Sequence, residues 1–475
     1  MKRRKFIKDS VIGASAFTIV PGTVLSRKGR VSPSDKLNIA VVGAGGRGEA
    51  LWSGAKESGK ANIVALVDVD DKRAANAYRS NPDAKRFKDY RDLEKIRDDF
   101  DAFMVATPDH THAVIGTALM DMGKHAYIEK PLAHSLYEVR QLTKKAEEKN
   151  LVTQMGNQGS SGDGIREITE WVAAGMIGEV TKALCWTNRP VWPQGRPEPK
   201  GASPIPDTLD WDLWQGPVPY KHYSPQYLPF KWRGWWDYGT GALGDMGCHI
   251  MDPVVRALKL KYPTEVSSSN TTVWIDDFYE ADYASSCPPS SITYLKFPAR
   301  DGMPPVDLHW YDGGLMPQFP EELDPDEKLG NWDGGILLIG DKGMISAGCY
   351  GLDPKLHFPD GNSNVEKPKP TLPRVEGGMG GHINQWVTAC IEGGETSSPF
   401  SYAGPLSEAV LMGNLGIRSY QMKVLQEGKT PTSWAPYNYP GRKRLLWDGE
   451  NMKVTNFDPA NEFVKRDYRE GWSLS

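Results

Sequence analysis

The stretch Val41-Val42-Gly43-Ala44-Gly45-Gly46-Arg47-Gly48 decides the fold of the first part of this chain. It continues the apolar, β-branched run of residues 36–42, which is typical of a buried strand. Residues 49–58, behind the glycines, follow a helical pattern. A strand, a glycine-rich turn and a helix in this order form the fingerprint of a dinucleotide-binding unit, so the sequence predicts a nucleotide site at this turn.

The residues of this turn have separate tasks in such a unit. Gly43 allows the tight turn, Gly45 lets the backbone approach a pyrophosphate, and Gly48 lets the helix pack closely on the strand. Gly46 and Arg47 lie where the helix begins and offers its unpaired N–H groups to the phosphates. We therefore expect all five residues to bind the cofactor.

A carboxylate follows the next predicted strand. Asp68 lies twenty residues past Gly48, where an acid accepts hydrogen bonds from the adenosine ribose hydroxyls. Asp70 is the alternative for this role, and strand register favours Asp68. Because an acid here repels a 2′-phosphate, the sequence predicts NAD rather than NADP as cofactor.

Strand-like and helical patterns alternate from residue 36 to about residue 155. This alternation predicts a Rossmann domain, with a parallel sheet and right-handed crossovers. The other predicted strands are residues 61–67, 101–106 and 125–128, and the other helices residues 72–78 and 112–122.

The alternation stops after residue 156, where proline, glycine and aromatic residues separate short strands such as 180–186 and 291–297. This pattern predicts a second α+β domain, residues 156–475, with a large and mostly antiparallel sheet. The fold class is therefore α/β in the first domain and α+β in the second.

Within the second domain, residues 239–252 are the most suggestive segment for catalysis. The glycines end at a predicted helix start, and Asp245 and His249 are four residues apart, on one helical face. A carboxylate beside an imidazole fixes its tautomer and supports a general base. The alternative is an ordinary surface hydrogen bond between the two side chains.

Three ordered motifs resemble those of the Gfo/Idh/MocA superfamily, named after glucose-fructose oxidoreductase, inositol dehydrogenase and rhizopine catabolism. They are the glycine fingerprint, the turn Glu129-Lys130-Pro131 and the spacing of Asp245 and His249. The resemblance implies an open-faced sheet in the second domain and a homo-oligomer. It also implies that Lys130, Asp245 and His249 are catalytic and that the Lys130–Pro131 bond is cis.

The resemblance adds a loop on the nicotinamide side, with Thr107, Pro108 and His112. His110 and His112 lack a third ligand nearby, so no metal is predicted. The predicted cofactor-binding residues are Gly43, Gly45, Gly46, Arg47, Gly48, Asp68, Thr107, Pro108, His112, Glu129 and Lys130.

Seven of the 16 tryptophans fall between positions 186 and 236. Trp192 and Trp232, with Arg189 and Arg233, would provide flat apolar faces and donors for a sugar ring. These residues could equally fill an irregular core or an oligomer interface. His382 is added to the predicted substrate site because its segment resembles one that borders the pocket in the family.

The composition excludes several classes of protein. The 56 basic and 60 acidic residues are interspersed and give a formal charge of -4, so nucleic acid is not an expected partner. The five cysteines are widely spaced and indicate neither a disulfide framework nor a zinc cluster.

Residues 1–30 have the pattern of an export signal. Arg3 and Arg4 stand in a basic start that precedes a short apolar run, and this order resembles the twin-arginine signals that export folded proteins. A basic amphipathic start of a cytosolic chain is the alternative. The signal predicts a periplasmic or otherwise exported protein, and no run in the chain is long enough to span a membrane.

Export constrains the expected mechanism, because free NAD is not supplied outside the cytoplasm. The first hypothesis is an NAD-dependent oxidoreductase that acts on a CH–OH group of a sugar or glycoside and holds its cofactor tightly. The second is an NAD-dependent glycosidase that oxidises, eliminates and re-reduces within one cycle. The third, from another class, is a non-catalytic carbohydrate-binding protein.

Overall fold

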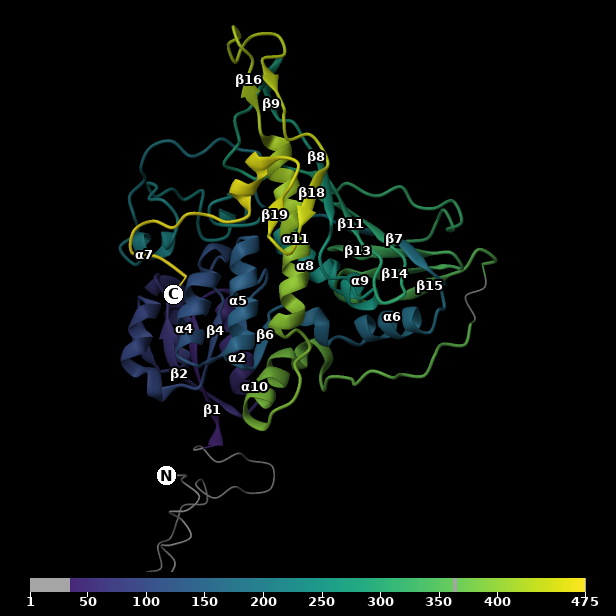
Figure 1. Cartoon of the computed structure of the whole chain (residues 1–475). Coiled ribbons are helices and arrows are strands. Elements are labelled where there is room, and N and C mark those ends of the chain that lie inside the picture. The colour runs from purple at the N-terminus through teal and green to yellow at the C-terminus, as the bar shows by residue number, and fades with distance from the viewer. Residues whose placement is uncertain (1–34, 362–364, 475) are drawn as a thin grey trace, which may run out of the picture.

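The computed structural model describes residues 35–361 and 365–474, which form two domains around one long helix (Figure 1). The predicted export signal, residues 1–30, lies outside the described residues.

The first domain is built on a six-stranded parallel sheet in the order β3-β2-β1-β4-β5-β6. This confirms the predicted Rossmann domain. Its last strand ends at Met155. The strands are β1 (Leu37–Val42), β2 (Ala61–Val67), β3 (Lys85–Phe87), β4 (Ala102–Val105), β5 (His125–Ile128) and β6 (Thr153–Met155). The helices are α2 (Arg47–Glu57), α3 (Asp71–Ser80), α4 (His112–Asp121) and α5 (Leu136–Glu148).

The second domain contains a nine-stranded sheet in the order β15-β14-β13-β7-β12-β11-β8-β18-β19. Of its pairs only β7 and β12 run parallel, so the predicted mostly antiparallel sheet is confirmed. Its strands are β7 (Val180–Thr187), β8 (Glu265–Asn270), β11 (Ser291–Phe297), β12 (Val306–Tyr311), β13 (Gly334–Gly340), β14 (Met344–Gly348), β15 (Lys355–His357), β18 (Leu445–Asp448) and β19 (Lys453–Val454). The helices are α6 (Asp163–Ala173), α7 (Trp211–Gln215), α8 (Gly241–Ile250), α9 (Asp252–Ala257), α10 (His382–Glu392) and α11 (Phe400–Gln421).

Two small hairpins project from the body, at the top of Figure 1. They are formed by β9 (Trp274–Asp276) with β10 (Tyr279–Glu280), and by β16 (Val424–Leu425) with β17 (Tyr437–Asn438).

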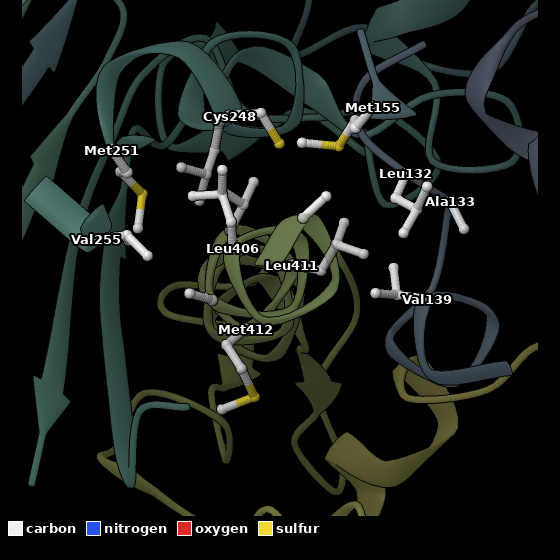
Figure 2. Close-up of a cluster of buried hydrophobic side chains, with 14 of the residues drawn as sticks. Leu132, Ala133, Val139, Met155, Cys248, Met251, Val255, Leu406, Leu411 and Met412 are labelled. Carbon is white, nitrogen blue, oxygen red and sulfur yellow. The ribbon is translucent and has the colours of Figure 1, made fainter. Parts of the chain in front are cut away.

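Helix α11 joins the two domains. It packs on α5 of the first domain and on α8 and β8 of the second. Figure 2 shows it end on, with Leu132, Val139 and Met155 on one side and Met251 and Val255 on the other. All five side chains are buried and belong to one continuous hydrophobic core. The position of the first domain against α8 is therefore fixed by apolar packing.

One face of the large sheet is covered by helices and the other is partly open. Strand β11 alternates between buried residues such as Leu295 and exposed residues such as Tyr294 and Lys296. This period of two is expected where one face packs on a core and the other faces water. Within the described residues, no helix is both long and apolar enough to cross a membrane.

Candidate active site

A cavity of about 510 Å³ opens at the carboxyl edge of the first sheet. It extends from the glycine turn after β1, past the ends of β2 and β4, to helix α8 of the second domain. Ligands of open parallel sheets bind at this edge, outside the carboxyl ends of the strands. Both domains line the cavity, so a molecule bound beside α8 would lie next to a cofactor bound at the glycine turn.

The glycine turn at one end has no room for side chains. Gly43 has a φ of 80°, and a Cβ atom there would lie 2.8 Å from the backbone of Ala106. A Cβ atom at Gly48 would overlap the carbonyl oxygen of Gly43, so α2 packs directly on the strand as predicted. The bare backbone of this turn fits a pyrophosphate, which needs close approach to N–H groups.

Asp68 and Asp70 have different roles. Asp68 accepts hydrogen bonds of 2.9 Å from the backbone N–H groups of Gly45 and Asp70, and its carboxylate lines the cavity. Asp70 also lines the cavity, but its side chain caps α3 by accepting from the N–H of Lys72. Burial raises the pKa of Asp68. Of the two carboxylates, Asp68 is therefore the one that does not cap a helix. It is also the one that strand register favours.

Arg47 and Glu129 form an ion pair of 2.7 Å across the cavity floor. The Glu129 carboxylate is 7% exposed, whereas Arg47 is 43% exposed and lies where α2 begins. The pair ties the glycine turn to the Glu129-Lys130-Pro131 turn, so the two predicted motifs are in contact.

Lys130 lies at the other end of the cavity, in contact with α8. Its Nζ donates to the Asp245 carboxylate at 2.9 Å and to the Asp245 backbone carbonyl at 2.5 Å. The side chains are 14% and 15% exposed, so this ion pair is shielded from solvent. An ammonium has three protons, and one remains for a ligand in the cavity. The Lys130–Pro131 bond is cis, as the family resemblance implied.

His249 lines the same end of the cavity, one helical turn from Asp245. Burial and the charge of Lys130 hold the pKa of His249 well below its usual value. The imidazole is therefore neutral near pH 7 and is able to accept a proton. Its Nδ1 is buried and has no hydrogen-bond partner among the described residues.

The predicted contact between Asp245 and His249 is corrected by the structure. Within the described residues, no hydrogen bond joins the side chains of Asp245 and His249. Asp245 instead accepts hydrogen bonds from Lys130 Nζ and, at 3.2 Å, from Arg233 Nε. Burial tends to raise the pKa of Asp245, but the two cations outweigh it and lower that pKa. Two full positive charges stabilise the ionised carboxylate more than a neutral imidazole does. Asp245 thus orients Lys130 rather than His249.

The other predicted residues divide into two groups. Thr107, Pro108, Trp232 and Arg233 line the cavity. His112 lies behind it, with its ring nitrogens 2.9 Å from the carbonyls of Pro131 and Thr107. His112 therefore braces the two turns that flank Lys130 and does not face the cavity.

Three predicted substrate residues do not line the cavity. The ring nitrogens of His382 contact Ser161 Oγ at 2.6 Å and the Met155 carbonyl at 2.9 Å, so neither remains for a ligand. Arg189 pairs with Asp333 at 2.7 Å, and Trp192 is buried beneath Arg233. All three are satisfied within the protein. The structure therefore places these three side chains outside the cavity, as the core alternative for Trp192 had allowed.

Several cavity residues carried no signal in the sequence. Tyr350 follows β14, and its ring centroid is 4.7 Å from that of His249. Its backbone has a φ of 67°, an uncommon and strained conformation for a non-glycine residue. Asp109, buried and bonded to Thr240 Oγ1 at 2.6 Å, also lines the cavity, and burial raises its pKa. Other cavity residues that were not predicted include Arg73, Gln158, Phe230 and Trp472.

No group of three or more His, Cys, Asp or Glu side chains that could hold a metal ion occurs in residues 35–361 and 365–474.

Two models of known protein families match parts of the chain. Residues 37–157 match the Gfo/Idh/MocA oxidoreductase family, NAD-binding Rossmann fold, and residues 164–271 match the C-terminal α/β domain of the same oxidoreductase family. The first domain is therefore an NAD-binding domain, and the glycine turn and Asp68 described above fit that cofactor.

Individual relatives are similar over part of the chain. A 4-carboxy-2-hydroxymuconate-6-semialdehyde dehydrogenase from Sphingobium is 33% identical over 121 residues, which are 26% of this chain and 38% of the relative. A glycosyl hydrolase family 109 protein from Shewanella is 30% identical over 168 residues, or 30% of this chain and 37% of the relative. The chain thus spans less than half the length of these relatives.

Solved structures show the same fold over a larger share. A levoglucosan dehydrogenase in complex with NADH covers 80% of this chain and 97% of its own length, with a TM-score of 0.52 and 17% identity. At this identity the likeness establishes the fold alone.

Proposed function

We propose that this chain, which carries the NAD-binding and C-terminal domains of the Gfo/Idh/MocA oxidoreductases, oxidises a hydroxyl-bearing carbon of a sugar or glycoside. One observation carries the proposal. A shielded ammonium, Lys130, and a neutral buried imidazole, His249, face one cavity at the end of the cofactor crevice opposite Asp68.

The two side chains suit the two charges that move in such a reaction. As a hydroxyl carbon is oxidised, its proton leaves the oxygen and negative charge develops there. His249 is suited to accept the proton, and the third N–H of Lys130 to stabilise the charge. Bound NAD supplies the acceptor for the hydride that leaves the carbon.

The surroundings of Lys130 support this role. Asp245 holds the ammonium by two hydrogen bonds, and Arg233 shares the same carboxylate oxygen. The guanidinium of Arg233 in turn lies 4.3 Å from the ring centroids of both Phe230 and Trp232. Phe230 and Trp232 thus pack against the guanidinium that contacts Asp245, and they add a flat apolar surface suited to a sugar ring.

A glycosidase that oxidises a ring carbon transiently is the second candidate. It is favoured by the similarity to a glycosyl hydrolase family 109 protein over 168 residues. The third hypothesis, a non-catalytic carbohydrate-binding protein, gains no support from a shielded lysine beside a neutral histidine, because binding alone does not need that pair.

From the twin-arginine pattern of residues 1–30, we propose that the protein is periplasmic or otherwise exported. These residues lie outside the described part of the chain. Replacement of Arg3 and Arg4 by lysine should leave the protein in the cytoplasmic fraction. An unchanged distribution between the fractions would contradict the proposed route.

The proposed reaction is tested with purified protein. Denaturation should release NAD or NADH if the cofactor is held tightly. Sugars and aryl glycosides are then added with an electron acceptor, and the formation of a keto-sugar is followed. Release of phenol from an aryl glycoside without net NADH would favour the glycosidase, and neither product from a broad panel would contradict both.

A further inference from the structure

The C-terminal segment of the chain returns to the first domain. After η8 (Asp458–Phe463), residues 464–474 run past α5 to α7 and end beside the Rossmann domain, where Figure 1 marks the C-terminus. Trp472 from this segment lines the cofactor cavity. A segment from the far end of the chain therefore forms part of the nucleotide site.

The start of this segment is anchored firmly. Glu138 of α5 accepts hydrogen bonds from Arg466 Nε at 2.8 Å and from Tyr468 Oη at 2.7 Å. The Glu138 side chain is 0% exposed. Because this buried carboxylate accepts from a guanidinium and a hydroxyl of the segment, it holds the start of the segment in place.

The end of the segment is anchored on and just after α7, through Arg469. Its guanidinium donates to the carbonyls of Gly216 at 2.6 Å and Asp212 at 2.7 Å and to the Asp212 carboxylate at 2.6 Å, and its backbone N–H donates to the Pro217 carbonyl at 3.0 Å. Asp212 is 65% exposed, and an ion pair in contact with water contributes little stability. Opening of residues 469–474 therefore requires the contacts of Arg469 with residues 212–217 to break, while the start of the segment stays bound to α5.

Trp472 occupies the space between the first domain and α7. Its ring centroid is 6.2 Å from that of Tyr90, and the Arg91 guanidinium lies 4.8 Å from the same ring. Tyr90 also lines the cavity. Two aromatic side chains thus meet at the end of the cavity that lies beyond Asp68.

Residues 208–213, here called the aromatic insertion, close the same end from another side. The backbone of Asp210 donates to Val69 at 2.8 Å, and Asp71 donates to Thr208 at 3.1 Å. These bonds attach the insertion to the loop that carries Asp68, and Leu209 and Leu213 line the cavity there. Residues from outside the Rossmann domain therefore help to enclose the adenosine end.

We propose that residues 464–474 form a latch that retains the dinucleotide, with Trp472 closing the adenosine end of the cavity and Arg469 holding it shut. The proposal rests on the proposed function, because it deepens the claim of a tightly held cofactor. Opening of the latch, and not dissociation from the glycine turn, then limits the release of the cofactor.

The test measures release directly, without any sugar. Protein loaded with NADH is mixed rapidly with excess NAD, and the loss of NADH fluorescence gives the release rate. For Trp472→Ala we expect release about fivefold faster, since an aromatic contact of this kind is worth roughly one kcal/mol. Arg469→Ala should accelerate release less, because Trp472 remains. The matched control is Trp434→Ala, at a ring that is 74% exposed on the β16–β17 hairpin.

Release at the wild-type rate from both latch variants, each shown by cooperative thermal unfolding to be folded, would overturn the latch. Equal acceleration by Trp434→Ala would do the same. Failure to oxidise any sugar with a normally retained cofactor would contradict the proposed function and leave the latch intact.

Discussion

The two ends of the cavity are built in different ways. The glycine turn at the nucleotide end comes from one short stretch, residues 43–48, in which backbone contacts leave no room for a Cβ atom at Gly43, Gly45 and Gly48. The reactive end brings together Lys130, Asp245, His249 and Tyr350 from separate parts of the chain. A backbone turn that requires glycine produces a recognisable sequence pattern. Side chains that come together from distant parts of the chain produce almost no such pattern.

The buried carboxylates of the cavity show the same contrast. Burial raises the pKa values of Asp68 and Asp109, whose hydrogen-bond donors are backbone N–H groups or a hydroxyl. Burial acts in the same direction on Asp245, but Lys130 and Arg233 outweigh it and lower its pKa. Full cations at the reactive end thus keep Asp245 ionised and fix the lysine beside it.

The largest effect should come from breaking the reactive end alone. Lys130→Ala should lower the rate of sugar oxidation by about a thousandfold, because the charge on the substrate oxygen loses its stabilising donor. Bound cofactor should remain, since the glycine turn and Asp68 are untouched. Single-turnover reduction of NAD measures the rate, and Lys182→Ala, on the exposed part of β7, is the control. A rate within threefold of the control would remove Lys130 from the mechanism.

The second effect concerns the protonation of His249. Because its pKa lies well below 6.5, a drop from about pH 8 to about pH 6 should not protonate it or reduce kcat/KM through it. His249→Gln should reduce kcat about a hundredfold, as expected for loss of a general base. An acid limb near the ordinary histidine pKa that is present in the wild type and absent from the variant would contradict the neutral imidazole.

A smaller effect is expected at the nucleotide end. Asp68→Ala should weaken NAD binding about tenfold, the size of one lost charge-assisted hydrogen bond, and reduce the preference over NADP. Asp70→Ala is the matched control, because it removes the cap of α3 and should cost about 1 kcal/mol of stability instead. Titration of intrinsic fluorescence with both nucleotides separates the two. Loss of cofactor discrimination in the control but not in Asp68→Ala would reverse the assignment.

The fold was largely predictable from the sequence. The glycine turn, the apolar strands and the alternation with helices led to the parallel sheet, since each signal is local. The structure also shows α10, far along the chain, packing on α2, with Trp386 in a core shared with β1. No periodicity reports such a partner, because a buried helix face has the same pattern whatever it contacts.

The candidate site was predicted only in part, for the same reason. Lys130 and His249 were found from their motifs, but the partner of Asp245 was not, because spacing along α8 says nothing about a lysine from another domain. Tyr350 has no motif, and its strained backbone is visible only in three dimensions. Trp472 was missed because nothing in the sequence indicates where the last segment returns.

The smallest effect on activity should come from His382, which the sequence assigned to the substrate and the structure places in the core. His382→Ala should change KM less than twofold but lower the free energy of unfolding by about 1–3 kcal/mol, because buried partners lose their hydrogen bonds.

Burial lowers the pKa of His382 to about 4. The unfolded histidine, with a pKa of about 6.5, binds a proton first, so this residue reduces stability as the pH falls from about 6.5 to about 4. Denaturant unfolding of wild type and variant should show that part of the pH dependence missing in His382→Ala. A large rise in KM with unchanged stability would return His382 to the substrate site and extend the reactive end of the cavity toward α10.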